Sequence, residues 1–451
     1  MIKIHRHTLL FGGFLLATLT VYGQGDGPTE ALTLEACQQL ARANYPQIRK
    51  LGLIEESSAY SLANASMVFL PKLSINGQAS YQSETVNFAN ALGGALPPGA
   101  SVPSLSKDQY RIQAEVSQTI YDGGASGNRR TLIKAGEAID KQQVQVSLYA
   151  LEDRVNQLYF SVLLMEEQSR QNQTRKADLE QAARKTAAAL EYGTAFRSSL
   201  DEIKAEIISV NMASIQFRSS RAAFLRMLGL LIGQELSDSV KLAMPAPKAT
   251  AVVSRHDIQR PELELFRLQK ELLDVEEKKL RSGYLPKLSA FFQGAWGRPM
   301  LNIISDEFGP WYITGARLTW NFGSLYTLKN DRRNLEIKRQ NMGIEKETFL
   351  LNTRISLEQE RGEIQKYLEL IEQDKKAIVL RASVKKAAEA QLENGVITPH
   401  EFIIRVNAEN LARQTLIMHQ IRLLQAQYDR RQISGNNDWQ SSNRSLNNPK
   451  K

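Results

Sequence analysis

The chain has 451 residues, of which 42% are hydrophobic, 23% charged and 7% aromatic, a composition typical of a folded protein and not of a disordered or collagen-like one. Lysine and arginine number 57 against 48 acidic residues, but they are spread along the chain beside acidic ones, which favours solvated helix faces over a nucleic-acid groove. With Cys37 as the only cysteine and five histidines, we expect no disulfide framework, no metal or cofactor site and no catalytic centre built on histidine or cysteine.

Residues 1 to 23 predict a secretory signal peptide. Lys3 and Arg6 precede an apolar stretch from Leu9 to Val21, and small residues follow at the positions that a signal peptidase reads. The alternative is an uncleaved anchor, but a membrane-spanning helix needs ~20 apolar residues and this stretch is shorter. No later stretch is apolar enough to cross a bilayer as a helix, so we expect any membrane insertion to be as β-structure.

The first half of the mature chain, residues 24 to 240, begins with a helix that starts near Thr33 and is broken or kinked at Pro46. Period-two alternation then predicts strands at about 72 to 82 and 110 to 121. The turn-rich residues 83 to 109 between them predict a long loop, which we expect outside the cell. On the first strand one side is apolar and is expected to face lipid; it carries Leu73, Ile75, Ala79 and Tyr81.

A very long helix follows the second strand, because Glu137 to Tyr192 contains neither glycine nor proline and would span ~84 Å. Steps of three and four residues predict a coiled-coil seam along it. The seam consists of Val144, Leu148, Leu151, Val155, Leu158, Val162 and Met165. It becomes smaller and more polar toward Gly193, where the chain is expected to turn back into a helix started by a capping box of Ser199 and Glu202.

The second half, residues 241 to 433, repeats the first. The motif Leu-Pro-Lys-Leu-Ser occurs around both Pro71 and Pro286, and a glycine turn before an Ala-Glu helix occurs at both Gly193 and Gly395. The second pair of strands is predicted at about 287 to 297 and 311 to 321. A second capping box is predicted at Thr398 to Glu401. Residues 434 to 451 are rich in asparagine, serine and charge and predict a disordered tail.

These elements together predict a conduit. Strands of ~9 to 11 residues can cross an outer membrane when tilted. Four strands cannot close a barrel, and free edges would leave unpaired backbone groups in hydrocarbon, so several chains must share one barrel. The long helices would then project into the aqueous compartment on one side. The rival hypothesis is an exported coiled-coil adhesin or surface fibre, which would not need four amphipathic strands at matching places.

The sequence resembles the TolC family of outer-membrane factors, the exit ducts of tripartite efflux pumps and type I secretion systems in Gram-negative bacteria. The resemblance rests on the run from Leu32 to Ala36, the two Leu-Pro-Lys-Leu-Ser junctions, the run from Ser117 to Gly124 and the paired glycine turns. Together these motifs cover nearly the whole mature chain in the family's order. The second strand exit, Trp320 to Ser324, departs from the aromatic-Asp-Gly-Gly pattern of the first.

The resemblance implies an α+β membrane protein with two internal repeats, in which a homotrimer forms a 12-stranded barrel continued by a coiled-coil α-helical barrel through the periplasm. It also implies a location in the outer membrane, in contact with its lipid. The partners would be a periplasmic adaptor (membrane fusion) protein and an inner-membrane transporter of RND, ABC or MFS type, and none would be nucleic acid. The transporter would set the substrate, whether a drug, a metal or a polypeptide.

The candidate site residues fall into three groups. The adaptor is expected to dock at the exposed hairpin turns Gly193, Thr194, Ala195, Gly395, Val396 and Ile397. Family members close the pore near the hairpin ends, which makes Arg197, Asp201 and Arg405 candidate gate residues. The helix–strand junctions are marked by Pro71, Pro286, Gly123 and Gly124.

Overall fold

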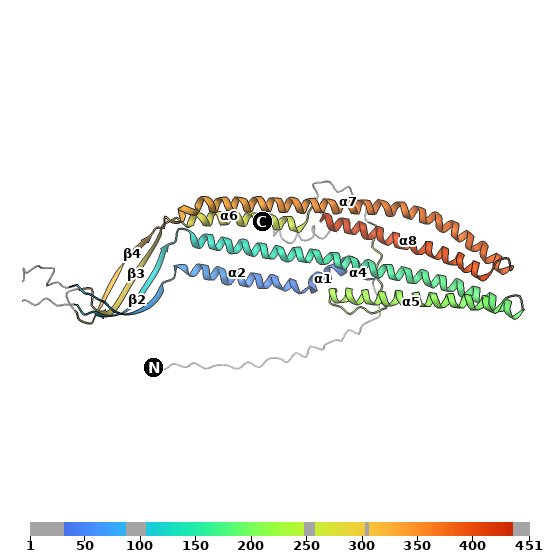
Figure 1. Cartoon of the computed structure of the whole chain (residues 1–451), viewed down its shortest axis with the longest axis horizontal. Helices are drawn as coiled ribbons and strands as arrows, with labels where there is room; N and C mark the ends of the chain where they lie inside the picture. The colour runs from blue at the N-terminus through green and yellow to red at the C-terminus, as the bar shows by residue number, and fades with distance from the viewer. Residues whose placement is uncertain (1–30, 87–104, 248–257, 303–305, 436–451) are drawn as a thin grey trace, which may run out of the picture.

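The computed structural model describes residues 31 to 86, 105 to 247, 258 to 302 and 306 to 435. The predicted signal peptide and most of the predicted loop at 83 to 109 lie outside these residues. In the described part a small β-sheet occupies one end of an elongated molecule, and two long helical hairpins extend from it to the other end (Figure 1).

The first helical segment is broken where the sequence predicts. Helix α1 (Leu34–Asn44) begins after Thr33, whose side chain accepts a hydrogen bond from the backbone N–H of Ala36. Proline cannot continue a helix, and a 3₁₀ turn (Pro46–Arg49) therefore separates α1 from α2 (Lys50–Ser66). A second 3₁₀ turn (Met67–Phe69) leads to the first strand.

One four-stranded antiparallel sheet has the order β1-β2-β3-β4. Its strands are β1 (Lys72–Tyr81), β2 (Asp108–Tyr121), β3 (Lys287–Arg298) and β4 (Gly309–Thr319), each beginning and ending within two residues of the sequence prediction. The register joins the apolar residues into rows across the sheet. For example, Leu73 pairs with Val116, which pairs with Phe292. Because direct cross-strand partners lie on the same face, the sheet has one apolar face.

The opposite face is polar on β1 and β2 and mixed on β3 and β4, where it also carries Phe291, Trp311 and Ile313. Ser74 pairs with Glu115, and Glu115 pairs with Gln293. Gln293 donates a hydrogen bond of 2.6 Å to Glu115, and Arg317 of β4 lies 3.4 Å from the same carboxylate. A single chain therefore presents a sheet with two chemically different faces and two unpaired edges, β1 and β4.

The two strand-to-helix exits are built differently. After β2, Gly123 and Gly124 have φ of +69° and +79°, and the carboxylate of Asp122 accepts hydrogen bonds from the backbone N–H of Gly124 (2.9 Å) and of Ser126 (2.7 Å). After β4, the side chain of Asn321 takes the place of Asp122 and accepts from the backbone N–H of Gly323, which has an ordinary helical φ of −59°. The departure from the aromatic-Asp-Gly-Gly pattern thus changes the backbone of the bend but retains a side-chain cap.

Two hairpins of long helices make up most of the molecule. The first consists of α4 (Ala125–Glu191) and α5 (Arg197–Ile232), and the second of α7 (Ser324–Glu393) and α8 (Pro399–Ser434). The 67 residues of α4 span ~100 Å, so the helix is longer than predicted because it begins directly after the β2 exit. The shorter α6 (Pro261–Ser282) runs beside α7 (Figure 1).

The largest apolar core lies where α1 meets the middle of α4 and the C-terminal parts of α5 and α8. The predicted seam of α4 supplies Leu151, Val155 and Val162, which pack against residues such as Leu225 and Leu228 of α5. Farther along α4 the seam becomes polar. Asn172 is fully buried there, and its amide donates hydrogen bonds of 2.8 Å to the Val210 carbonyl and to the Ser214 hydroxyl. The predicted seam and its increasing polarity are thus present.

Three expectations need correction. Ser199 and Glu202 do not form a capping box, because α5 begins two residues earlier at Arg197, with Phe196 as an N-cap that makes no side-chain hydrogen bond. Ser434 belongs to α8 and is fully buried, so the predicted tail would begin after Gly435. The predicted boundary at residues 240 and 241 falls within a segment that packs on the first half, where Leu242 forms a parallel bridge with Leu32.

No helix in the described part of the chain is long and apolar enough to cross a membrane.

Candidate functional site

The hairpin ends have the same backbone geometry. Gly193 and Gly395 follow α4 and α7 with φ of +72° and +66°, a left-handed conformation that glycine adopts without strain. In each turn the N–H of the next residue, Thr194 or Val396, donates a hydrogen bond of 2.8 Å to a carbonyl five residues back. This bonding pattern satisfies carbonyls left open at the helix end, so each glycine is required by the turn itself.

The predicted docking residues lie at the far end of the hairpins from the sheet (Figure 1). Gly193, Thr194, Gly395 and Val396 are exposed, and a Cβ added to either glycine would meet no atom within 4 Å. Ala195 is half-buried. Ile397 is also half-buried and packs against the apolar cluster between the hairpins. The two turns therefore differ in chemistry, and the second is anchored by Ile397.

The predicted gate residues do not join the hairpins. Arg197 Nε lies 3.5 Å from Asp201 Oδ2, but both side chains are on α5 and are more than half exposed. Arg405 is exposed on α8, one turn after Glu401. These contacts are local to one helix each, so the gate roles of the three residues stay predictions.

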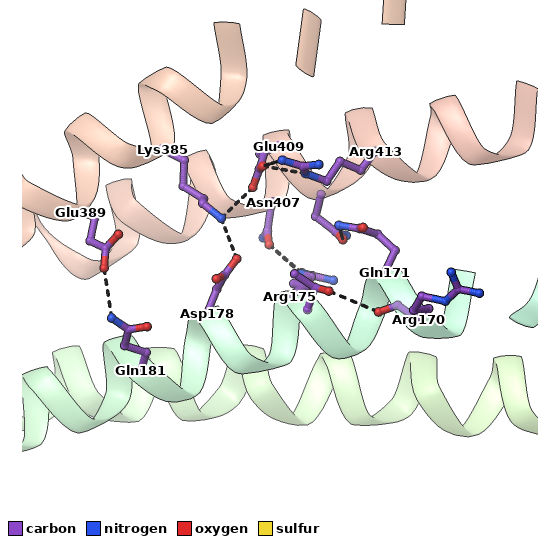
Figure 2. Close-up of polar contacts among 12 residues, drawn as sticks. Arg170, Gln171, Arg175, Asp178, Gln181, Lys385, Glu389, Asn407, Glu409 and Arg413 are labelled. Carbon is purple, nitrogen blue, oxygen red and sulfur yellow. Dashed lines mark hydrogen bonds and ion pairs between the residues drawn. The ribbon is translucent and has the colours of Figure 1, made fainter. Parts of the chain in front are cut away.

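Instead, a polar cluster that we name the hairpin clasp connects all four long helices (Figure 2). It comprises Arg175 and Asp178 of α4, Glu206 of α5, Lys385 of α7, and Asn407 and Glu409 of α8. Because Asp178 lies 15 residues before Gly193, the clasp lies ~22 Å from the hairpin end. It thus occupies the tapering part of the molecule.

Lys385 is the residue on which one half of the clasp depends. Its Nζ lies 2.7 Å from Asp178 Oδ2 on the other hairpin and 2.8 Å from Glu409 Oε2 on its own hairpin. Burial by itself lowers the pKa of Lys385, but the hydrogen bonds to Asp178 and Glu409 outweigh it, and the pKa is raised. Burial likewise raises the pKa of Glu409, and its bonds to Lys385 and Arg413 reverse this, so both groups are held in their charged forms.

Arg175 forms the other half of the clasp. Its guanidinium pairs with Glu206 and donates to the amide oxygen of Asn407 from Nε (3.0 Å) and Nη2 (2.7 Å). The Asn407 amide in turn donates to Glu206 at 3.0 Å. Arg175, Glu206 and Asn407 therefore close a three-membered ring of hydrogen bonds across both hairpins.

Closer to the turns the hairpins are joined by apolar packing and by exposed charges. Leu179 and Ile203 of the first hairpin pack with Phe402 and Val406 of the second. Exposed pairs such as His400 Nδ1 with Glu202 (2.5 Å) also connect the hairpins. Surface ion pairs contribute only about 0–1 kcal/mol, so the clasp and the apolar cluster provide most of the specific contact.

Sequence reasoning missed the clasp, although one signal was present. The repeated Ala-Glu pair that marks the two halves places Glu206 and Glu409 at related positions, and each of these glutamates binds the half-buried cation of its half of the clasp. No group of three or more histidine, cysteine or acidic side chains in the described residues is arranged to hold a metal ion.

A separate carboxylate cluster lies between the clasp and the sheet, where Asp429 of α8 approaches Asp153 of α4 and Glu360 of α7. Burial, followed by repulsion from Asp153 and Glu360, raises the pKa of Asp429 to about 7, against weaker opposing effects of Gln425 and Arg422. A carboxyl whose pKa is raised on folding makes the protein less stable as the pH rises through the interval between its unfolded and folded values, here about 4 to 7.

We therefore expect Asp429→Asn to raise the urea midpoint of unfolding at pH 8 and to leave it nearly unchanged at pH 4. Glu347→Gln is the control, because Glu347 is exposed on α7 and lies outside the cluster. Urea unfolding followed by circular dichroism at both pH values measures the effect. An equal gain for Asp429→Asn at both pH values would show that folding does not raise the pKa of Asp429.

The structure is similar to known outer-membrane channels over nearly its full length. No protein-family model and no curated protein sequence matches the chain. Among solved structures, CusC is 14% identical with a TM-score of 0.66, and the match covers 89% of this chain and 91% of CusC. The outer-membrane channel OprN is 11% identical, with a TM-score of 0.66 and 91% of each chain covered. The outer-membrane protein VceC of Vibrio cholerae is 12% identical, with a TM-score of 0.63 and coverage of 89% and 96%.

The chain thus has the fold of the TolC-like outer-membrane factors, and the resemblance predicted from sequence motifs is confirmed at the level of fold. The likeness extends from the sheet to the hairpin ends, since about nine-tenths of each chain is matched.

Proposed function

We propose that this protein is the outer-membrane exit duct of a tripartite efflux pump or a type I secretion system, and that it conducts substrates passively and performs no catalysis. The observation that carries the proposal is the likeness to outer-membrane channels over nearly the full length of the chain. This chain joins a sheet with one apolar face to two long hairpins. The sheet would lie in the outer membrane and the helices in the periplasm.

The duct would be a homotrimer. The edges of β1 and β4 are unpaired within one chain, and burying them in a membrane requires neighbouring strands, which three chains would supply in a 12-stranded barrel. The apolar face of the sheet, which includes Leu73 and Ile75, would contact lipid. Exposed apolar residues along α7, such as Ile344, Leu351 and Ile355, are consistent with a neighbouring chain covering that helix.

The two halves of the chain would be structural repeats. Each half consists of a helix, two strands and a long hairpin in the same order, with a Leu-Pro-Lys-Leu-Ser junction before its first strand. In a trimer the six hairpin turns would surround the inner end of the duct. We propose that a periplasmic adaptor docks on these turns and couples the duct to an inner-membrane transporter.

The hairpin clasp is our candidate for the element that holds the inner end closed. It is a half-buried polar contact between the two hairpins near their ends, and polar contacts can be exchanged for water at lower cost than an apolar core. Separating the hairpins at the clasp would widen the inner end, and would also separate Leu179 and Ile203 of the first hairpin from Phe402 and Val406 of the second. Arg197, Asp201 and Arg405 would act nearer the turns.

The test is the state of the protein in cell membranes. We expect it in the outer-membrane fraction, where it should be extracted by detergent only and migrate on unheated gels near three times the mass of one chain, falling to one chain on heating. Extraction by salt alone, or a band insensitive to heat, would instead support the coiled-coil adhesin.

A further inference from the structure

A cluster of basic residues lies at the start of α7, next to the sheet. β4 ends at Thr319 and α7 begins at Ser324, and the exposed residues Lys329, Arg332 and Arg333 occupy its first three turns. Asp331 is the only acidic residue in this stretch. Within the described part of the chain none of the three cations forms an ion pair.

Farther from the sheet the same helix does have acidic partners. Arg339, two turns beyond Arg332, contacts Asp274 at 2.9 Å and Glu277 at 2.7 Å on α6. The neighbouring Lys338 also lies within reach of an α6 carboxylate, that of Glu276 at 3.9 Å. In the described residues the chain thus supplies ion-pair partners to Lys338 and Arg339, but not to the three cations at the first turns, although the charge of Arg332 also acts on Glu277 of α6. An external anion has room to bind beside these cations.

The shape of this surface matches an amphipathic ligand. A hollow of about 700 Å³ is lined by the three cations together with Leu325, Leu328, Asn330 and Glu336, so that three positive charges face one negative charge. The leucines lie nearer to the sheet along the helix and the cations lie farther from it. A phospholipid whose acyl chain lies beside the sheet and whose phosphate points toward the helices has the same order of apolar and charged groups.

Exposed aromatic side chains lie between the sheet and the cations. Trp320 and Phe322 stack with ring centroids 4.8 Å apart, and Tyr326 is 86% exposed. Tryptophan and tyrosine are enriched where a membrane meets water, because their rings are apolar and their tips polar. Their position assigns the first turns of α7 to the level of the lipid headgroups.

The neighbouring helices carry the same charge at the same level. Arg129 and Arg130 are exposed on the first turns of α4, and Lys278 and Lys279 are exposed near the end of α6. The two helices are in register there, since the Asn128 amide donates a hydrogen bond of 3.3 Å to the Lys278 carbonyl. Figure 1 shows that α4, α6 and α7 meet the sheet at one level along the long axis.

We propose that the start of α7 binds the headgroup of an anionic phospholipid in the leaflet that faces the helices. Lys329, Arg332 and Arg333 bind the phosphate, and Leu325 and Leu328 contact the first part of an acyl chain. The inference rests on the proposed function, because only a sheet that spans the membrane places this helix end beside a leaflet. Each basic residue near an anionic membrane surface strengthens binding, so removing three should weaken it at least about tenfold.

The experiment compares intact trimers purified in detergent and mixed with phosphatidylglycerol or phosphatidylethanolamine, with the bound lipids counted by native mass spectrometry. The wild-type trimer should retain phosphatidylglycerol in preference to phosphatidylethanolamine, and the triple variant Lys329→Gln, Arg332→Gln, Arg333→Gln should lose that preference. The control, Lys346→Gln, Arg354→Gln, Lys376→Gln, removes the same charge from exposed positions of α7 farther from the sheet and should behave as the wild type.

Other outcomes would overturn the proposal. Equal retention of both lipids by the wild type, or unchanged retention by the triple variant, would exclude the site. Displacement of phosphatidylglycerol by an equal concentration of glycerol 3-phosphate would show a site for free anions. A triple variant that fails to trimerise, while the control does, would show that a second copy of the chain covers the hollow. Trimers that conduct but lack lipid preference refute only this inference, whereas absence of any wild-type trimer refutes the proposed function.

Discussion

Replacing Lys385 with methionine should increase the open fraction of trimers reconstituted in a planar lipid bilayer by roughly tenfold. Methionine fills similar space but removes the cation shared by Asp178 and Glu409, and leaves these two carboxylates facing one site. Hydrogen bonds to charged groups contribute about 1.5–3 kcal/mol, and because Asp178 is about one-third exposed we expect a loss near the lower end, about 1.4 kcal/mol for a tenfold change.

Two further variants distinguish an effect on the open fraction from a general loss of stability. Lys375→Met removes an exposed ion pair within α7, with Glu372, and should leave conductance unchanged. Adding Asp178→Asn to Lys385→Met removes one of the stranded carboxylates and should recover part of the closed state. If Lys385→Met leaves the trimers as closed as the wild type while their thermal stability falls, the clasp stabilises the fold and does not hold the gate.

Adding side chains to both hairpin turns should abolish export without affecting trimer assembly. Asparagine tolerates the left-handed conformation, so Gly193→Asn with Gly395→Asn adds bulk at the docking turns at little backbone cost. Valine at the same positions adds bulk and strains the backbone by about 1–2 kcal/mol per site. A Cβ at either position would meet no atom of the described residues within 4 Å, so we expect the obstruction to come from a partner.

Cross-linking to the adaptor in cells, together with the heat-sensitive trimer band, measures the two effects separately. Loss of cross-linking and export with asparagine, with the trimer intact, is the expected result. Normal export with asparagine but failed assembly with valine would mean that the glycines serve only to end the helices. Thr348→Asn, at an exposed position of α7 away from the turns, is the control for a surface change.

Local sequence patterns were sufficient to predict the strands and the seam. The alternation around Leu73 and Ile75 locates β1, and the three-four spacing from Val144 to Val162 identifies residues that are buried, except Leu158, which is partly buried. Both patterns reflect periods of a single element, 2 for a strand and 3.6 for a helix, and need no knowledge of the neighbours. The turns at Gly193 and Gly395 were predictable for the same reason, since a left-handed residue is a local requirement.

The clasp was not predictable in this way. Asp178 and Lys385 are 207 residues apart, and their contact depends on how one hairpin is rotated and shifted against the other, which no single period encodes. The capping box expected at Ser199 and Glu202 was wrong because a Ser-x-x-Glu pattern also fits the interior of a first turn. At Thr398 the pattern coincides with a proline at the first helical position, and the box is present.

The helices that follow the two turns, α5 and α8, therefore differ in the stability of their first turns. At the second turn Thr398 and Glu401 bond reciprocally to each other's backbone, whereas α5 begins at Phe196 with no side-chain cap. A cap contributes about 1 kcal/mol, so the first turn of α5 should fray several times more often than that of α8. Amide protons near Arg197 should then exchange with solvent before those near Glu401. A protein that docks on the turns would meet one helix, α5, whose first turn unfolds readily, and another, α8, whose first turn stays folded. The first turn of α5 would adapt its backbone to the partner, whereas that of α8 would keep its conformation.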